Sequence, residues 1–262
     1  MKLVTFNIRC DYNQDGINNF EFRKPYILAK IHKESPDIIC FQEVLPHVAD
    51  WLKDNLTEYY IIGCGRDEQL KNEQMSIAYK RTRYNLIQME VFWLSDTPYI
   101  PGSRYTNQSD CPRVCTTALF QELESNVIFR IYNTHLDHIG SEARALGLKQ
   151  ILEHITEHGR MEGPPLSAPI ILTGDLNAFP NSDELQQLKQ YPDLLDLTSH
   201  IPGTFHDYGR LSEPEKIDYI IAQNGILCNQ VTIWDDNHQG IYLSDHYPVC
   251  AELLLTPSFH LD

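Results

Sequence analysis

Two short segments in the C-terminal half place acidic, amide and imidazole side chains directly against apolar runs. They are residues 174–177 (GDLN), which follow the apolar run 170–172, and residues 244–246 (SDH), which precede the apolar run 247–250. A buried strand that ends in a carboxylate or a carboxamide loses solvation free energy unless a metal ion or another partner compensates. Carboxylate and amide oxygens are ligands of hard divalent cations, and a histidine beside them can move a proton. The two segments therefore indicate metal-assisted hydrolysis of a phosphate ester.

Further polar side chains stand where other apolar runs meet loops. In sequence order they are Asn7, Glu43, His135, Asp137, His138 and Asp218. Each has a simpler interpretation when taken alone, because asparagine favours turns, glutamate is common at helix starts and a lone histidine is usually structural. Their joint occurrence at strand ends, where a rigid scaffold can hold catalytic groups, favours an active site.

Eleven strand-like runs and four helical patterns must position these groups. The strand-like runs are 3–8, 37–42, 59–63, 76–80, 86–93, 114–122, 127–134, 170–173, 217–222, 227–234 and 248–255. The helical patterns are 23–33, 47–55, 141–158 and 183–190, and residues 159–169 are expected to form an internal loop. Because strands outnumber helices and many strands are joined as hairpins, we expect an α+β protein with mixed sheets covered by helices.

Composition limits the class of protein and its partners. The 262 residues, 42% of them hydrophobic, suffice for one large domain, which we expect to span residues 1–262. A net charge of −15 repels nucleic-acid phosphates, so stable binding to duplex DNA is not expected. The seven cysteines include no Cys-x-x-Cys pair, which argues against a zinc or redox motif. With no leader-like segment and no long apolar run, we expect a cytoplasmic monomer without a membrane segment.

The order of the strand-end motifs resembles the endonuclease/exonuclease/phosphatase superfamily. This superfamily includes exonuclease III-like nucleases, pancreatic-type deoxyribonucleases, neutral sphingomyelinases, inositol polyphosphate 5-phosphatases and deadenylases. The resemblance extends from Met1 to about Leu255, and residues 92–98 (FWLSDTP) are similar to compact bacterial members and to deadenylases. It implies a four-layer α/β sandwich, in which helices flank two packed mixed β-sheets, and a requirement for Mg²⁺ or Mn²⁺, bound as one ion or two.

The resemblance also implies which residues form the site. The implied metal ligands are Glu43, Asn7 and Asp245. The implied catalytic residues are His246, Asp218, Asp175, Asn177 and His135. The substrate-binding residues are Arg113, which is similar to an arginine of some branches, and His206, which precedes the Asp218 strand. The roles of Asp137, His138 and Glu73 stay open.

Within this set, Glu43 is implied to be the main metal ligand. Asp175 and Asn177 are implied to orient the water and hold the phosphate, and His246 is implied to act with the support of Asp218. We expect a carboxylate beside His246 to favour its protonated form. Arg9 departs from the pattern of apurinic endonucleases, which carry an aspartate at that place, and this departure argues against a role in DNA repair.

The sequence therefore predicts a divalent-metal-dependent hydrolase that cleaves a P–O bond by attack of an activated water. The acidic net charge favours a small-molecule or lipid-type phosphoester as substrate. The alternative is a nuclease, either an endonuclease or a 3′-exonuclease similar to the deadenylases, acting on DNA or RNA. A catalytically silent binding module on the same fold is disfavoured, because such a relative should have lost one of the implied ligands.

Overall fold

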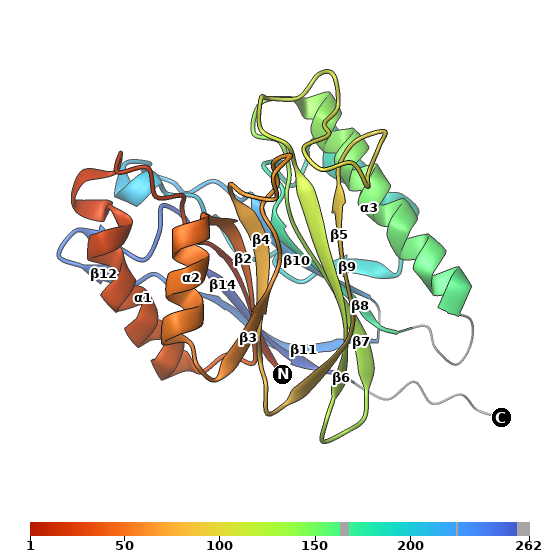
Figure 1. The fold of residues 1–262 in the computed structure, drawn as a ribbon, viewed down its shortest axis with the longest axis horizontal. Helices are drawn as coiled ribbons and strands as arrows, with labels where there is room; N and C mark the ends of the chain where they lie inside the picture. Colours follow the sequence, from red (N-terminus) through yellow and green to blue (C-terminus); the bar gives the residue numbers. More distant parts are fainter. Residues whose placement is uncertain (163–167, 224, 256–262) are drawn as a thin grey trace.

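Two six-stranded β-sheets form the centre of this computed structural model, which describes residues 1–162, 168–223 and 225–255 (Figure 1). The first sheet has the order β11 (Leu227–Ile233), β14 (Val249–Leu254), β1 (Lys2–Asn7), β2 (Ile38–Val44), β4 (Gln74–Lys80) and β3 (Tyr59–Ile62). The second has the order β5 (Tyr84–Trp93), β6 (Val114–Glu122), β7 (Ile128–His135), β8 (Ile170–Asp175), β10 (Asp218–Gln223) and β9 (Leu194–Asp196). Both sheets are mixed, because β1 pairs with β2 and β7 with β8 in parallel, whereas neighbouring pairs run antiparallel.

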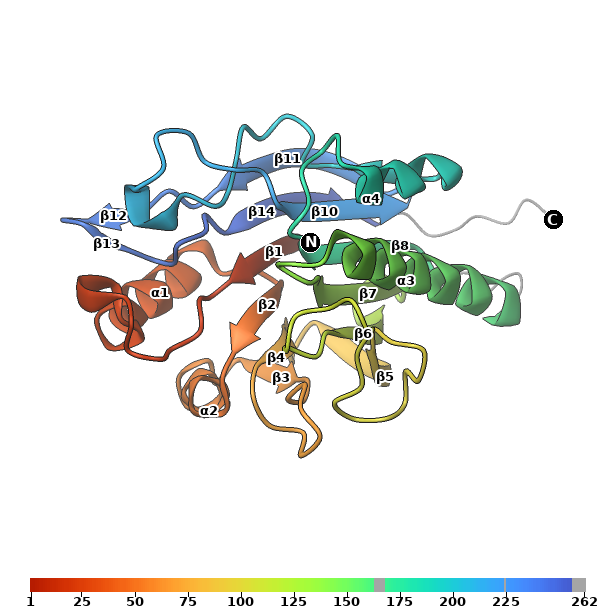
Figure 2. The same ribbon diagram turned by 90° about the horizontal axis from the view of Figure 1, so that it is seen from above.

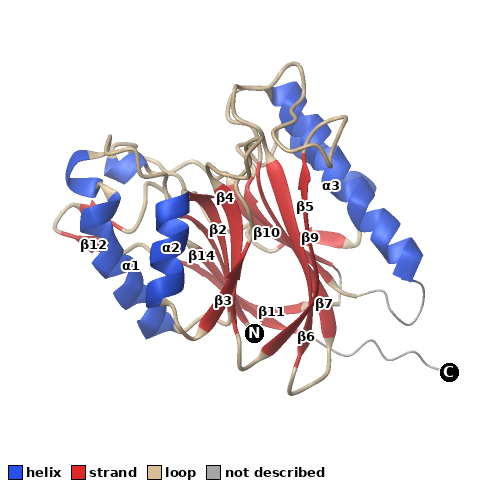
Figure 3. Ribbon diagram, viewed as in Figure 1, coloured by secondary structure: helices blue, strands red, loops and turns tan. Residues whose placement is uncertain are grey.

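Helices cover the outer face of each sheet, which gives the layer order helix, sheet, sheet, helix (Figures 2 and 3). The first sheet is covered by α1 (Phe20–Glu34) and α2 (Pro46–Asn55), and the second by α3 (Ser141–Glu162) and the short α4 (Asp183–Gln186). Shorter elements are the 3₁₀ turns Gly16–Asn18, Gln187–Gln190 and Asp207–Gly209 and the ribbon of β12 (Asn237–His238) with β13 (Ile241–Tyr242). The four-layer sandwich implied by the sequence is confirmed. Across the described ranges, no helix has both the length and the apolar character needed to cross a bilayer.

The strands alternate their side chains between an inner layer, where the two sheets meet, and outer layers beneath the helices. On β1, Leu3 faces the inner layer and Val4 packs under α1 and α2. On β7, Ile131 faces the inner layer and Tyr132 packs under α3. Because successive strand residues point to opposite faces, each central strand is buried on both sides, and this explains its continuous apolar run.

The inward-facing positions of the central strands become more polar toward one end of the sandwich. Read along the chain they are Leu3, Thr5 and Asn7 on β1; Ile38, Cys40 and Gln42 on β2; Ile131, Asn133 and His135 on β7; and Ile171, Thr173 and Asp175 on β8. In the middle of this gradient the sheets are joined by hydrogen bonds. The Asn133 amide donates to the Phe41 and Ser76 carbonyl oxygens at 2.8 and 3.0 Å, and Gln42 Nε2 donates to Asn133 Oδ1 at 2.7 Å.

Most predicted elements are present, but several boundaries differ. Helix α1 begins at Phe20 rather than residue 23, because the buried guanidinium of Arg23 donates to the carbonyl oxygens of Asn18, Ile8 and Leu243 and so fixes the first turn. The predicted loop at 159–169 is wrong at its start, since α3 continues to Glu162, and residues 163–167 lie outside the described part. The sequence patterns did not predict the short strands β9, β12 and β13, which have two or three residues each.

Candidate active site

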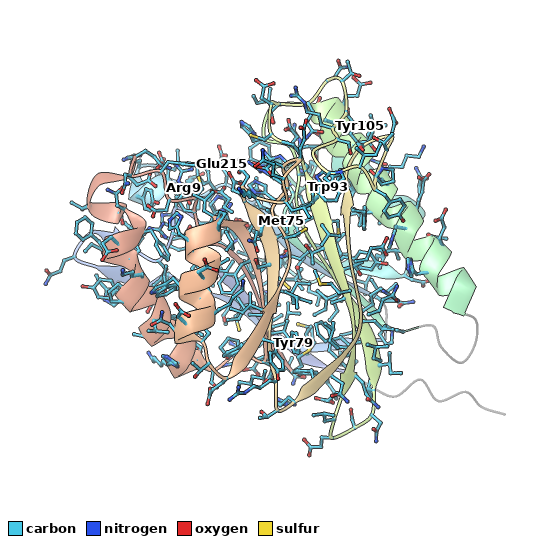
Figure 4. The ribbon with its side chains drawn as sticks, viewed as in Figure 1. Arg9, Met75, Tyr79, Trp93, Tyr105 and Glu215 are labelled. Carbon is cyan, nitrogen blue, oxygen red and sulfur yellow. The ribbon has the colours of Figure 1, made fainter. Side chains whose placement is uncertain are left out.

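The polar ends of the central strands meet at one end of the sandwich, between the two sheets. Strand pairing places Asp175 beside His135 on one side and beside Asp218 on the other. In Figure 4, Arg9 and Glu215 lie at this end, Met75 lies deeper between the sheets, and Tyr79 lies toward the opposite end. A cavity of about 590 Å³ opens here.

Glu43 lies at an irregularity of β2 and points toward the cavity. The pairing of β2 with β4 shifts register between Phe41 and Val44, and the backbone φ of Glu43 is 63°, in the left-handed region that glutamate rarely adopts. Its carboxylate accepts hydrogen bonds from Asn7 Nδ2 at 3.0 Å and from the Cys10 amide at 2.7 Å. A β-bulge re-aims a side chain in this way, and the cost in backbone strain is typical of functional sites.

The charge on Glu43 is favoured in spite of its burial. Burial alone would raise the pKa of the Glu43 carboxyl, but His135, the Cys10 amide and Arg9 together hold this pKa below its usual range. Asn7 is the hub of the hydrogen bonds here, because its Nδ2 also donates to Asp175 Oδ2 at 3.1 Å. Asn7 therefore fixes two carboxylates relative to each other from the end of β1.

Asp175 is held from several sides at the end of β8. Its Oδ1 accepts from the Asn177 amide at 2.9 Å, and its Oδ2 lies 3.4 Å from His135 Nε2. The preceding residue, Gly174, has φ 145°, and a Cβ there would lie 2.0 Å from the Thr134 carbonyl oxygen, so only glycine allows β8 to run this close to β7. Burial and the neighbouring charge of Asp218 raise the pKa of Asp175 to about 7.

His246 is paired with Asp218, as the sequence resemblance implied. His246 Nδ1 and Asp218 Oδ2 are 2.8 Å apart, and both side chains are buried. Burial opposes the charged imidazole, but the charge of Asp218 and its hydrogen bond raise the pKa of His246 to about 10. Asp175, Asp218 and His246 place one possible ligand atom each within 4.8 Å of one another and could hold a metal ion. A protonated His246 has no free lone pair, so we interpret this group as a hydrogen-bonded set.

Asp245 and Asn177 are the remaining residues of the predicted metal-binding and catalytic groups, and they lie on two sides of the cavity. Asp245 accepts from Ser244 Oγ at 3.0 Å and lies 3.4 Å from Arg9 Nη1. Asn177 also has a positive φ, 47°, and its Nδ2 donates to the Leu136 carbonyl oxygen at 3.0 Å. Its Oδ1 is the remaining polar atom of this side chain, and Asn177 lines the cavity.

Buried arginines line the cavity on the side of β4, β6 and β7. Arg113 donates through Nη2 to His138 Nδ1 at 2.8 Å, and its Nε lies 3.6 Å from Asp137 Oδ2. Arg66 donates through Nη2 to Glu73 Oε1 at 2.8 Å. Nε and Nη1 of both arginines are buried without a hydrogen-bond partner in the described residues. Burial and the charge of Arg66 lower the pKa of Arg113, which indicates two like charges close together.

The structure does not bring His206 to the cavity. Its ring is buried and stacked on Tyr247, with centroids 3.9 Å apart, and its Nδ1 accepts from the Gly209 amide at 3.1 Å. The His206 amide donates to the Asp245 carbonyl oxygen at 2.9 Å. His206 therefore supports the loop that carries Asp245, and we do not retain it as a substrate contact.

Several cavity residues were not predicted as site residues from the sequence. They are Arg9, Arg66, Arg144, Phe179, Phe205 and Glu215, and Glu73, whose role the sequence left open, also lines the cavity. Arg66 and Glu73 lie in an irregular loop between β3 and β4, where no periodic pattern indicates the direction of a side chain. Phe179 follows the 174–177 motif by two residues and is exposed, so an aromatic residue directly after a polar strand end was the one available signal.

This site and fold define a class of phosphoester hydrolase, and comparison with known proteins identifies the family. The chain matches the Endonuclease/Exonuclease/phosphatase family over residues 4–246 and belongs to it. An endonuclease/exonuclease/phosphatase from Bacteroides vulgatus is 32% identical, with a TM-score of 0.89 over 97% of this chain and 98% of its own. A mannosyl-6-phosphatase from Bacteroides thetaiotaomicron is 26% identical, with a TM-score of 0.87 over 97% and 100%. An uncharacterised protein of Acanthamoeba polyphaga mimivirus is 26% identical over 95% of this chain and 98% of its own.

Members of this family generally depend on a divalent metal, and the donor set of this chain fits one. Glu43 and Asp245 are buried carboxylates on the wall of one cavity. Burial raises the pKa of Asp245, the charge of Glu43 adds to this rise, and His246 opposes it. Buried acids that disfavour each other's charge are stabilised by a cation, and oxygen donors suit a hard one such as Mg²⁺ or Mn²⁺.

Proposed function

We propose that this protein hydrolyses a small phosphomonoester, such as a sugar phosphate, with the help of a divalent cation. Glu43 and Asp245 would hold the cation, with Asn7 either as a third ligand or as the residue that fixes Glu43. The bound cation would neutralise charge that develops on the phosphoryl oxygens. The remaining chemistry is assigned to side chains of the chain itself.

Unpartnered donors on Arg66 and Arg113 are the observation on which the choice of a monoester rests. Four nitrogens of these two guanidiniums are buried and make no hydrogen bond within the described residues, and both arginines belong to the cavity lining. Leaving charged donors unsatisfied costs free energy, so a ligand that accepts from them is expected. A phosphate monoester offers three terminal oxygens and two negative charges, whereas a diester offers two oxygens and one charge. A monoester can therefore accept more hydrogen bonds from the guanidiniums of Arg66 and Arg113, and neutralise more of their charge, than a diester can.

The strand-end residues are assigned roles by their positions. Asp175, whose two oxygens are fixed by Asn177 and Asn7, would accept a proton from the attacking water. His246, charged through Asp218, would donate a hydrogen bond to a phosphoryl oxygen as negative charge develops there. Asn177 Oδ1 would orient the water. Asp175 lies between β7 and β10, and hydrogen bonds hold its carboxylate and His246 in place, so little reorganisation is needed at the moment of reaction.

The size and rim of the cavity support a compact substrate. A volume of about 590 Å³ is in the usual range for small-molecule sites. Phe179 and Ile139 are exposed and belong to the cavity lining, so they offer an apolar surface for the face of a sugar ring. The mannosyl-6-phosphatase of Bacteroides thetaiotaomicron, 26% identical along nearly the whole chain, adds support for a phosphorylated sugar.

A nuclease activity is the competing function, and the charge of the chain counts against it for duplex DNA. With 21 basic and 36 acidic residues, the chain offers few cations that could displace the counterions of a duplex. A short single strand could place its terminal phosphate at the two arginines. The substrate test below therefore includes both kinds of nucleic acid.

The proposal is tested by kcat/KM at matched salt with Mg²⁺ and with Mn²⁺, together with a sample from which metal has been removed. The substrates are hexose 6-phosphates, an aryl phosphodiester, single-stranded oligonucleotides, duplex DNA and sphingomyelin. We expect activity only with metal and at least about a 10²-fold preference for the monoester, the effect of one well-placed charged contact. A preference for any diester or nucleic acid would contradict the proposal.

Variants of the arginines sharpen this test. Arg113→Gln should lower kcat/KM for the monoester by about 10²-fold and for the diester by much less. Arg104→Gln is the matched control, because Arg104 lies in the loop before β6 but its side chain is 43% exposed and pairs with Asp110 at 2.7 Å. Equal losses on monoester and diester would show that Arg113 does not recognise the extra charge.

A further inference from the structure

A second cluster of ligand-type side chains lies on the outer face of the second sheet, under α3. His154 and His158 are four residues apart on α3 and share one helix face, and Glu90 is on β5. Glu90 shares a strand face with Phe92, whose ring stacks on His154 with centroids 4.4 Å apart. Each of the three residues offers one ligand atom, and these atoms lie within 4.8 Å of one another. None of the three lines the active-site cavity.

The distance between the ligand atoms of His154 and Glu90 matches the distance between two ligands of one metal ion. His154 Nε2 and Glu90 Oε2 are 3.3 Å apart, yet Nε2 is buried and makes no hydrogen bond within the described residues. Two ligands at 2.0–2.1 Å from a tetrahedral metal ion are separated by about 3.4 Å. The two atoms therefore have the separation expected for two donors directed at one metal ion.

The other ring nitrogens are engaged in a way that suits metal binding. His158 Nδ1 lies 3.1 Å from the His154 carbonyl oxygen, so Nδ1–H donates and the lone pair stays on Nε2. His154 Nδ1 lies 3.2 Å from the Tyr132 hydroxyl, which can accept its proton. A metal-binding histidine commonly donates its second ring N–H to a neighbouring oxygen, which fixes the tautomer and the orientation of the ring.

The charge state of the two histidines, His154 and His158, agrees with this geometry. The rings of His154 and His158 stack with centroids 4.2 Å apart, which disfavours a charge on both. Burial and the neighbouring His158 lower the pKa of His154, and Glu90 opposes this effect. A neutral imidazole is therefore available at neutral pH, and metal binding requires that form.

We propose that Glu90, His154 and His158 form a second metal site, which binds a transition-metal dication of the Zn²⁺ type and ties α3 to the edge strand β5. Two imidazoles and one carboxylate suit Zn²⁺, Co²⁺ or Ni²⁺ better than Mg²⁺, which prefers an all-oxygen set. Water would fill the fourth position. The site is structural, and it is separate from the carboxylates assigned to hydrolysis.

Zinc titration by calorimetry and thermal unfolding tests this site in the metal-stripped full-length protein. Four proteins are compared: the wild type, Glu43→Gln, His154→Gln/His158→Gln, and the control His32→Gln/His200→Gln, which removes two exposed histidines elsewhere. We expect the wild type, Glu43→Gln and the control to share one Zn²⁺ site. At a hundredfold excess over Kd, Zn²⁺ should raise their Tm by roughly 5–10 °C. The double variant at 154 and 158 should lose this site, with Kd weakened by at least about 100-fold.

A second variant covers the case in which loss of both stacked rings unfolds the protein. Glu90→Gln keeps the packing against α3 and removes one charged ligand, and it should weaken Zn²⁺ binding while Mg²⁺-dependent turnover stays unchanged. Substitution of Co²⁺ gives an independent signature, because a tetrahedral site with nitrogen and oxygen ligands produces visible absorption bands that Glu90→Gln should remove. Unaltered Zn²⁺ affinity and Co²⁺ spectra in Glu90→Gln would overturn the proposal and leave the cluster a packing contact. Loss of the Zn²⁺ site in Glu43→Gln instead would assign the ion to the active site.

Discussion

The two halves of the inner layer have the same strands but opposite chemistry. In the half near Phe129, the sheets meet through an apolar cluster that includes Ile131, Phe120 and Tyr84. In the other half, the same strands present Asn133, Gln42 and then the carboxylates of the site. Burial of apolar side chains stabilises the first half, whereas the second half buries like charges and keeps some donors unpaired. The difference indicates that one strand can serve stability at one end and chemistry at the other.

The largest expected effect comes from neutralising the centre of the polar half. Asp175→Asn should lower kcat by about 10³–10⁴-fold, because it removes the group assigned to accept a proton from water. Stability should stay equal or rise slightly, since burial and Asp218 disfavour the charge on Asp175. Turnover with the proposed monoester and thermal unfolding of the same sample measure both quantities. A large loss of Tm, with activity lost only in proportion, would make Asp175 structural and break the comparison.

The reciprocal change is made in the apolar half. Phe129→Ala should reduce the free energy of unfolding by about 3–5 kcal/mol, because a fully buried ring leaves a cavity beside Phe120 and Tyr84. The kcat of the folded fraction should be within about twofold of wild type, since the site is built by the opposite ends of these strands. Urea unfolding and initial rates well below the midpoint test this. A fall in kcat comparable to that of Asp175→Asn would show that the halves are not separable.

The smallest expected effect is a change with pH in the stability that Asp137, in the polar half, contributes to the folded protein. Burial opposes ionisation of Asp137, but the Gly140 amide, Ser109 and Arg113 lower the pKa of its carboxyl below the usual value. The native state therefore gains stability from this group above the unfolded-state pKa, near 4, and loses the gain as pH falls through the lower folded pKa. Asp137→Asn should cost about 1–3 kcal/mol at pH 7 and clearly less at pH 3.

Urea unfolding at pH 7, 5 and 3 measures this difference. Asp110→Asn is the control, because the Asp110 side chain is fully exposed and its pairing with Arg104 should matter little at any of these pH values. A constant penalty for Asp137→Asn across the three pH values would show that its charge is not what the backbone amides recognise.

The strand-end half of the site was the more predictable part from sequence. Asp175, Glu43 and His246 stand next to apolar runs, which predicts their place where strands meet loops. Strand alternation puts Asp175 on the inward face, whereas the irregularity of β2 directs Glu43 to the cavity. The pairing of His246 with Asp218 came from the family resemblance alone, since the two residues are 28 positions apart and no pattern between them fixes the contact. The role of each residue in the reaction stays a prediction.

The arginine side of the site was not predictable apart from Arg113. Arg66 is held by tertiary contacts, namely the pairing with Glu73 and the hydrogen bond of 2.6 Å from Trp93 Nε1 to its carbonyl oxygen. No local rule links residue 66 to residue 93. His206 is the reverse case, because its position before the Asp218 strand predicts a substrate contact whereas its ring packs on Tyr247 and does not line the cavity. Whether a loop side chain such as Arg66 or His206 reaches the cavity depends on packing partners that are distant in the chain.

The left-handed backbone of Glu43 has a consequence for directed evolution of this protein. A library screened only for heat resistance should enrich glycine or asparagine at position 43, because these residues tolerate the positive φ that glutamate rarely adopts. Such clones would keep the fold and lose the main candidate metal ligand. Selection schemes for a hardier enzyme therefore need an activity screen in every round, and the residue recovered at position 43 reports whether that screen was effective.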